Sequence, residues 1–488
     1  MISMKNRTLS ISLLIFIHIS IPFQHSPAAA LEPEYAVMLE RKIGERIDAV
    51  VRKRAFRDVR VAIALSFVDG GQVIYQRNAE RPLITASAIK VFPAAITLAK
   101  LGPEYRFETF IMMDGDVKEG TLSGNLYLVG RGDPALKAKD LQSAANEIKR
   151  QGIDCIGGDI VYDVSFFDEE KNRYAPNARN LYAPPCALSV NFNTIDVGID
   201  DRGPSPRLWL IPETSYAQLR YDIRVEKTET PGRPVMTYRE FPWGDQYRIR
   251  GTVTDWDKRY RYLRLGVSRP GLYAATLFQE ACKSSGITMG GATRKGPAPP
   301  NARRVDRISS APLKDIIGMM NQESNNLIAE MVNKDLGAIF GSPPGTRAKG
   351  IAVIKQFCVE EIGIPAEELS IHDACGLSAK NRLSASHFVK ALNYFSTDPA
   401  LAPTFPSTLN RRIYQLSNKG TSIHLLSKSG TLSVSGVNTE VGYIVLDNTG
   451  GVFSFAILAN RTKRGPMTYS GTLTNPLLNA IIGAFECD

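Results

Sequence analysis

The sequence predicts an α/β fold of the mixed (α+β) kind, in which an N-terminal segment and the C-terminal half form one discontinuous domain. Three observations predict it. The first hundred residues alternate helical and strand patterns. The residues after 304 begin with helices and finish with strands. Residues 106–303 repeat apolar positions mainly with a period of two. We therefore expect the middle region to be inserted as one or two smaller, mostly β domains.

The N-terminal segment begins with a predicted helix at 35–55, where apolar residues recur at helical spacing. Residues 61–67 and 72–75 are typical of a strand pair, and Asp69-Gly70-Gly71 between them is a hairpin signal. A second helix is predicted at 87–101, because Gly102-Pro103 is a helix stop.

The rest of the chain follows the same two periods. Strands are predicted within 106–128, 220–225, 247–253, 421–445 and 451–460, and helices within 140–151, 274–285, 311–338, 347–361 and 473–485. The Pro-rich residues 297–301 predict a linker or boundary.

The N-terminus predicts export. Lys5 and Arg7 precede an apolar stretch of about 15 residues, which ends before Ala28-Ala29-Ala30. These are the three parts of a secretory signal, and we assign it to residues 1–30. The alternative, a membrane anchor, needs about 20 apolar residues. The expected location is the periplasm or another exported compartment.

The composition restricts the classes of partner that the chain is expected to bind. The chain has 488 residues, and its content of 43% hydrophobic and 22% charged residues excludes a disordered or fibrous protein. Without residues 1–30 it carries 57 basic and 49 acidic residues, a formal charge of +8. Such a charge favours anionic partners and permits at most peripheral membrane association. Export and the lack of a recognised binding module argue against nucleic acid.

Six cysteines allow fifteen disulfide connectivities in an exported protein. The nearest neighbours in sequence, Cys155 with Cys186 and Cys358 with Cys375, are the pairs we expect. The spacings include no C-x-x-C or H-E-x-x-H, so the sequence predicts neither a metal site nor a cofactor.

One catalytic constellation stands out. Ser87-Ala88-Ile89-Lys90 is the only S-x-x-K in the chain, and on a helix its hydroxyl and amine share a face. A nucleophilic serine needs a base within hydrogen-bond reach, and a lysine whose pKa is lowered by burial can serve. There is no G-x-S-x-G elbow and no phosphate loop.

Two further motifs follow in order. Ser324-Asn325-Asn326 lies between two predicted helices, where a helix N-cap would be the simpler explanation. Lys428-Ser429-Gly430-Thr431 ends a predicted strand, where an ordinary exposed strand would be the simpler explanation. The ordered set of S-x-x-K helix, S-x-N loop and K-[ST]-G strand is that of penicillin-interacting serine enzymes.

With these motifs the chain resembles the D-alanyl-D-alanine carboxypeptidase/endopeptidases of the class C low-molecular-mass penicillin-binding proteins. Ser324 follows Ser87 by 237 positions, an interval that fits the family's long insertion. Segments such as 124–134, 157–163, 182–191 and 273–278, and Asp373-Ala-Cys-Gly-Leu-Ser378 with Asn381-Arg382, also look like family signatures.

The resemblance implies a β-lactamase/transpeptidase-like domain built from residues 31–106 and 304–488. It also implies two nested inserted domains, the outer one from 107–135 and 209–303 and the inner one from 136–208. The expected partners are peptidoglycan stem peptides, with β-lactam antibiotics as inhibitors.

The resemblance also assigns roles, position by position. Ser87 is expected to be acylated, Lys90 to accept its proton, and Ser324 to relay a proton to the leaving amine. Substrate is expected to be held by five residues: Asn326, Lys428, Ser429, Gly430 and Thr431. The oxyanion hole would be the N–H groups of Ser87 and Thr431.

Three positions depart from the family pattern. Ser429 stands where threonine is commoner, and Ala379-Lys380 stands where many relatives have an arginine near the substrate's side chain. Pro93 lies six residues into the predicted catalytic helix, where it is expected to remove a hydrogen bond and kink the helix.

Two other functions use the same features. A β-lactamase or esterase would share the nucleophile, but it needs a deacylating tyrosine or glutamate that these motifs do not supply. A non-catalytic wall-binding protein would keep the motifs by descent and use basic stretches such as Lys258-Arg-Tyr-Arg-Tyr-Leu-Arg264.

Overall fold

The computed structural model describes residues 31–170, 183–200, 206–226, 234–254, 262–415, 422–447, 450–462 and 473–486. The predicted signal at 1–30, residues 258–261 of the basic stretch and Cys487 lie outside this part. Among the described residues, no helix is both long and apolar enough to cross a bilayer.

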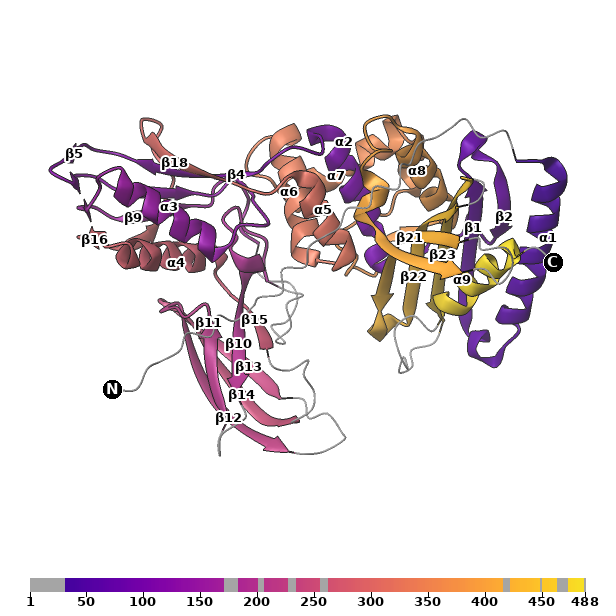
Figure 1. Cartoon of the computed structure of the whole chain (residues 1–488), viewed down its shortest axis with the longest axis horizontal. Helices are drawn as coiled ribbons and strands as arrows, with labels where there is room; N and C mark the ends of the chain where they lie inside the picture. The colour runs from indigo at the N-terminus through magenta and orange to yellow at the C-terminus, as the bar shows by residue number, and fades with distance from the viewer. Residues whose placement is uncertain are drawn as a thin grey trace.

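A six-stranded sheet joins the two ends of the chain, with strand order β2-β1-β23-β22-β21-β20 (Figure 1). The N-terminal strands β1 (Val59–Phe67) and β2 (Val73–Arg77) form the predicted hairpin at one edge. The other strands are β20 (Asn410–Gln415), β21 (Ser422–Leu432), β22 (Val437–Leu446) and β23 (Val452–Arg461). Since β1 pairs along its whole length with β23, the discontinuous α/β arrangement is confirmed.

Helices cover both faces of this sheet. On one face lie α1 (Pro33–Val51) and α9 (Thr474–Ile482), whose apolar residues pack against the sheet in one hydrophobic cluster. On the other face a larger cluster gathers α2 (Val91–Leu101), α5 (Leu313–Gln322), α7 (Arg347–Glu360) and α8 (Ala385–Thr397). The predicted helices in these regions are confirmed.

The first and last strands of the insert lie side by side. Strands β4 (Glu108–Met113) and β18 (Arg303–Ser309) are antiparallel neighbours, and Ser310 donates its N–H to the Phe107 carbonyl at 2.9 Å. With β7 (Leu126–Val129), β9 (Ile160–Asp163) and β17 (Thr293–Lys295) they form a five-stranded sheet. Residues 297–301 therefore connect two strands of one sheet.

Beside it lies a smaller sheet of β5 (Val117–Lys118), β6 (Thr121–Leu122), β8 (Cys155–Ile156) and β16 (Thr288–Met289). Helices α3 (Ala138–Arg150) and α4 (Pro270–Ser284) pack on these sheets. Strands β8 and β9, which come from residues 136–208, pair with strands from both flanks of the insert.

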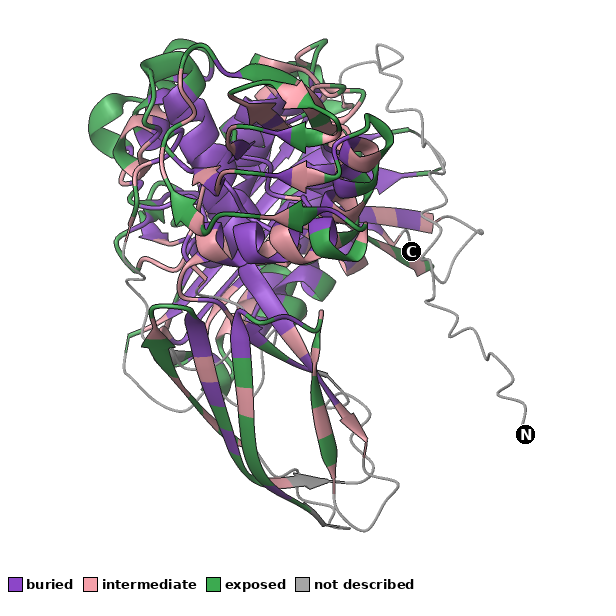
Figure 2. Ribbon diagram, turned by 90° about the vertical axis from the view of Figure 1, so that its left-hand side faces the viewer, coloured by how far each residue is buried: buried purple, intermediate pink, exposed green. Residues whose placement is uncertain are grey.

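The remaining strands of the insert form a separate lobe (Figure 1). One three-stranded sheet contains β10 (Thr194–Asp200), β11 (Arg207–Ile211) and β15 (Tyr262–Gly266). The other contains β12 (Ala217–Glu226), β13 (Val235–Phe241) and β14 (Gly244–Thr254). Figure 2 shows buried and exposed residues alternating along these strands, as expected for sheets with one solvated face.

Helix α6 (Asn326–Gly341) joins the two halves, because it is buried on both sides. Ile328 and Val332 belong to the core beneath the six-stranded sheet, whereas Leu327 and Met331 belong to the core of the insert. Its buried residues also include the charged Glu330 and Asp335, so the helix is enclosed on most of its circumference. The N-terminus of α6 is thereby held between the sheet and the insert.

The predicted disulfides are wrong. Cys155, Cys186, Cys282, Cys358 and Cys375 all carry free thiols. Cys358 lies within α7 and Cys375 in a loop beyond it, and short separation along the chain does not provide the Cα–Cα distance of about 5.5–6 Å that a disulfide requires. Burial raises the pKa of the Cys375 thiol well above its ordinary value.

Candidate active site

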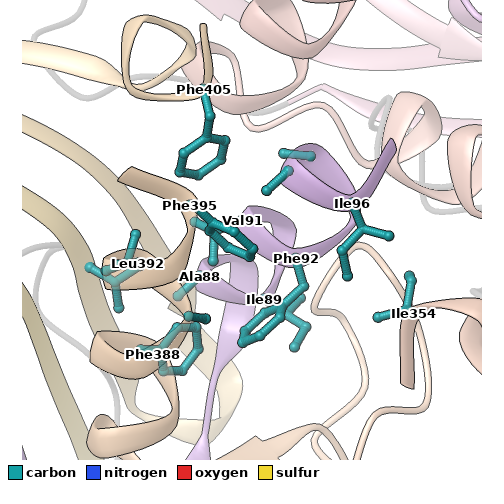
Figure 3. Packing of buried hydrophobic residues seen from close by; sticks show 14 of the residues in the cluster. Ala88, Ile89, Val91, Phe92, Ile96, Ile354, Phe388, Leu392, Phe395 and Phe405 are labelled. Carbon is teal, nitrogen blue, oxygen red and sulfur yellow. The ribbon is translucent and has the colours of Figure 1, made fainter. Parts of the chain in front are cut away.

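Ser87 lies on a 3₁₀ turn, η3 (Ala86–Lys90), which leads directly into α2. Figure 3 shows how the apolar side of this turn and of α2 is anchored, with Phe92 facing Phe388 and Phe395 of α8. Their ring centroids lie 5.5 and 6.2 Å from that of Phe92. The packing holds the polar side of the turn in a fixed position.

The kink expected at Pro93 is absent because α2 begins only at Val91. Pro93 therefore lies in the first turn of the helix, where a backbone N–H has no intrahelical acceptor to lose. The boundary between the 3₁₀ and α segments was not visible in the apolar pattern.

Lys90 is fully buried beside Ser87 and donates to three acceptors. Its Nζ lies 3.1 Å from Ser87 Oγ, 2.7 Å from Asn326 Oδ1 and 2.5 Å from the Cys375 carbonyl oxygen. Burial lowers the pKa of Lys90 to about 8, although nearby negative groups oppose this shift. The structure thus brings the S-x-x-K and S-x-N motifs together.

Ser324 and Lys428 form the second half of the site. Lys428 Nζ donates to Ser324 Oγ at 3.0 Å and to the Ser429 carbonyl at 2.7 Å. Burial, with the charge of Lys90 as a smaller cause, lowers the pKa of Lys428 to about 7. The N-cap of α6 is Asn325, which accepts from the Ile328 N–H, so Ser324 is not occupied with capping.

Strand β21 runs very close to the Ser87 turn at Gly430. A Cβ at this position would lie 2.6 Å from the Ser87 nitrogen and 2.5 Å from Thr439 Oγ1, so only glycine fits. Thr439 Oγ1 in turn donates to the Thr85 carbonyl at 2.8 Å, which fixes the start of the turn against β22. The close approach brings the backbone around Thr431 to the N-terminus of the turn.

The other two residues of the K-[ST]-G strand differ in exposure. The Ser429 side chain is exposed. Thr431 is half-buried, and its Oγ1 accepts from Asn438 Nδ2 at 3.2 Å, which leaves the hydroxyl proton available.

Two non-glycine residues of the site have left-handed backbones. Ala86, which precedes Ser87, has φ +45°, and Ser324 has φ +54°. Each such conformation costs about 1–3 kcal/mol and persists where the surroundings impose it. Both lie in turns that present a candidate catalytic hydroxyl.

The loop at 373–381 supplies a group that the motifs did not reveal, the carbonyl of Cys375. Glu330 of α6 accepts from the N–H groups of Ala374 and Cys375, each at 3.0 Å, and from Arg347 Nε at 2.8 Å. Asp373 accepts from the N–H of Gly376 at 2.7 Å. These contacts aim the Cys375 carbonyl at Lys90.

Glu330, Asp373 and Cys375 also place possible metal-ligand atoms within 4.8 Å of one another. The carboxylates are engaged by backbone N–H groups and by Arg347, and the Cys375 thiol is held in its protonated form. The cluster therefore serves as a hydrogen-bonded support for the loop.

Two buried carboxyl groups lie behind the site, at the contact between α6 and the insert. Asp335 has no hydrogen-bond partner among the described residues, and neither has Asp133 Oδ2. A Cβ on Gly132 would lie 1.9 Å from Asp335 Oδ1, which shows how closely the segments meet. Burial raises the pKa of Asp133 to about 7 and that of Asp335 far above its ordinary value.

Comparison with known proteins identifies the class. The chain belongs to the D-Ala-D-Ala carboxypeptidase 3 (S13) family, which it matches over residues 43–470. This membership confirms the predicted enzyme class, a serine-type D-Ala-D-Ala carboxypeptidase.

Two individual relatives that are similar to the chain over most of its length belong to the same class. The chain is 26% identical over 449 residues to the D-alanyl-D-alanine carboxypeptidase of Actinomadura sp. (strain R39), covering 86% of this chain and 81% of the relative. It is 24% identical over 426 residues to the D-alanyl-D-alanine carboxypeptidase DacB of Haemophilus influenzae, covering 82% of this chain and 87% of the relative.

The fold has a solved counterpart. The crystal structure of penicillin binding protein 4 (dacB) from Haemophilus influenzae matches with a TM-score of 0.74 and 21% identity. The match covers 89% of this chain and 97% of that structure, so the predicted transpeptidase-like fold class is confirmed.

Proposed function

We propose that this protein hydrolyses the bond between two terminal D-alanines of peptidoglycan stem peptides through an acyl-enzyme on Ser87. The observation that carries the proposal is the continuous hydrogen-bonded contact among Ser87, Lys90 and Asn326. A buried amine with a pKa of about 8 can take up the serine proton near neutral pH.

In the acylation step, Ser87 Oγ bonds to the carbonyl carbon, its proton passes to Lys90, and the peptide C–N bond breaks. The departing D-alanine amine receives a proton through Ser324, which contacts Lys428. Water then hydrolyses the ester and restores the Ser87 hydroxyl. Each oxyanion would be held by the N–H groups of Ser87 and Thr431, and such donors are worth about 3–4 kcal/mol each.

The charged groups and hydrogen-bond donors of the site indicate how the substrate would bind. Asn326 contacts Lys90 through its Oδ1, so its amide N–H₂ is the group that would bind the substrate backbone. The terminal carboxylate is assigned to Lys428 and to the hydroxyls of Ser429 and Thr431. Gly430 permits the close approach of this strand to Ser87.

The proposal extends to location and to domain boundaries. Residues 1–30 direct export to the periplasm or an equivalent compartment, and mass measurement of the secreted chain should give a product that begins at Leu31. Residues 31–106 and 304–488 make the transpeptidase-like domain. Within the insert, strand pairing favours an outer domain that includes β8 and β9 and an inner domain of β10 to β15.

Fluorescent penicillin tests the nucleophile. The wild-type protein should be labelled covalently, Ser87→Ala should not be labelled, and the exposed Ser143→Ala should be labelled like wild type. Labelling of Ser87→Ala would overturn the assignment. A related structure, penicillin binding protein 4 from Haemophilus influenzae, has been solved in complex with a β-lactam.

Two further measurements separate the alternatives. Incubation with muropeptides should release single D-alanine residues, and loss of cross-linked dimers would show endopeptidase action in addition. Nitrocefin should give a stoichiometric burst followed by slow turnover, whereas sustained rapid turnover would indicate a β-lactamase.

A further inference from the structure

The inner lobe of the insert has one strongly basic sheet face. On β12, β13 and β14 the side chains of one parity point away from the core, as the alternation in Figure 2 shows. The exposed residues of this face include five arginines: Arg220, Arg224, Arg239, Arg248 and Arg250. Asp222 is the one acidic residue of this face among those whose burial is described, and Glu226, at the end of β12, has the same parity.

The strand register places these charges next to one another. Arg220 of β12 lies directly opposite Arg248 of the central strand β14, and Asp222 lies opposite Arg250. Neighbouring strands are about 4.8 Å apart, and alternate residues of one strand are about 6.6 Å apart. The arginines thus form a flat array with charges repeated in two directions.

The described residues provide no ion-pair partner for the five arginines of the array. None of the five guanidinium groups forms an ion pair or hydrogen bond within the described part of the chain, although Arg264 of the neighbouring sheet does pair with Asp196. Like charges directly opposite each other destabilise a sheet. An external anion would relieve this repulsion.

The shape and chemistry of the face restrict the anion. An array spread over a sheet face fits an extended ligand with repeated charges. Guanidinium groups bind carboxylates through two parallel hydrogen bonds. Among the described outward residues of the three strands only Val235 and Phe241 are apolar, and Trp243 of the adjoining turn stacks on Phe241. This is too little apolar surface for insertion into lipid.

We propose that this arginine face binds the peptidoglycan polymer through the free carboxylates of its stem peptides, away from the catalytic residues. This inference rests on the proposed function, because a D-Ala-D-Ala carboxypeptidase acts on stem peptides that end in a carboxylate. A polymer carries many such peptides, so several weak contacts act together. The face would keep the enzyme on its substrate between turnovers.

Cosedimentation with insoluble peptidoglycan tests the proposal. The variant Arg220→Gln/Arg248→Gln/Arg250→Gln should bind about tenfold more weakly than wild type, since each exposed pair contributes modestly. Asp222→Asn should bind more tightly. Binding should disappear near 1 M salt, where the screening length is about 3 Å, and should fall when the carboxylates are converted to amides.

Two controls make the outcome decisive. Lys53→Gln/Arg54→Gln/Arg57→Gln removes three exposed charges from the other half of the molecule and should leave binding unchanged. Equal loss in both triple variants, or wild-type binding by the arginine variant, would overturn the proposal. Arginine-dependent binding to phosphatidylglycerol vesicles without binding to peptidoglycan would also overturn it.

Two activity measurements distinguish a failure of this proposal from a failure of the proposed function. Hydrolysis of a soluble pentapeptide and labelling by penicillin depend on the site around Ser87 and not on the arginine face. Both should be the same in wild type and in the arginine variant. If the wild type shows neither activity, the catalytic assignment is wrong, whatever the face binds.

Discussion

The amine of Lys90 lies 2.5 Å from the carbonyl oxygen of Cys375, and this contact defines the orientation of the amine. A neutral lysine has two N–H bonds and one lone pair. With the N–H bonds directed to the Cys375 carbonyl and to Asn326 Oδ1, the lone pair faces Ser87 Oγ. A backbone carbonyl therefore helps to hold the base in its proton-accepting orientation.

The rate of acylation by penicillin should rise with pH as Lys90 loses its proton near pH 8, and fall again at higher pH because neutral Lys428 no longer attracts the carboxylate. Lys90 accepts a proton only when neutral, and burial lowers its pKa to about 8. About one molecule in ten would carry a neutral Lys90 at pH 7, against about one in three thousand for an ordinary lysine. Second-order acylation rate constants from pH 6 to 10 test this, and a flat profile would exclude Lys90 as the base.

Glu330→Gln should lower the acylation rate by about tenfold to a hundredfold, because the amide cannot accept from both backbone N–H groups and Arg347 while keeping the loop in place. Its midpoint should also move to lower pH, since the negative charge of Glu330 raises the pKa of Lys90. The exposed Glu323→Gln serves as control. A slower enzyme with an unchanged midpoint would contradict the electrostatic part of this argument.

Gly430→Ala should reduce acylation by about a hundredfold to a thousandfold, the loss expected for a displaced oxyanion donor. The added methyl group would meet the Ser87 nitrogen at 2.6 Å and push β21 away from the turn. Gly318→Ala is the matched control, because no atom lies within 4 Å of its new Cβ. Equal acylation rates in the two variants would show that the close approach is unimportant.

Asp133→Asn should stabilise the protein at alkaline pH. The folded state raises the pKa of this carboxyl from 3.8 to about 7, so it binds more protons than the unfolded chain between these values. Stability is therefore lost as pH rises through this window, by at most about 4 kcal/mol. The melting temperatures of variant and wild type should agree near pH 4 and diverge by pH 8, and a constant difference would contradict the assignment.

Local patterns predicted much of the fold. Helices and strands of the catalytic half follow periods of 3.6 and 2 that are visible in the sequence. The three motifs were expected to meet, and the structure places Lys90 beside Asn326 and Lys428 beside Ser324. Motif order was informative because each motif specifies both a side chain and the type of element that presents it.

Other features depend on contacts that no local pattern records. The Cys375 carbonyl is part of the peptide backbone, so its role is independent of the side chain at that position. The pairing of β9 with β7 and β17 joins residues far apart in sequence, so it could not be read from any local pattern. The segment at 373–378 was singled out, but its contact with Glu330 was not.

The position of β1 between β2 and β23 has a consequence for how the molecule is made. A chain synthesised from its N-terminus completes every strand of the insert before Val452 exists. The insert can thus acquire its sheets early, while β1 waits for the last long strand. Ser87 and Lys90 contact residues at 326, 375 and 430, so their complete surroundings require nearly the whole polypeptide.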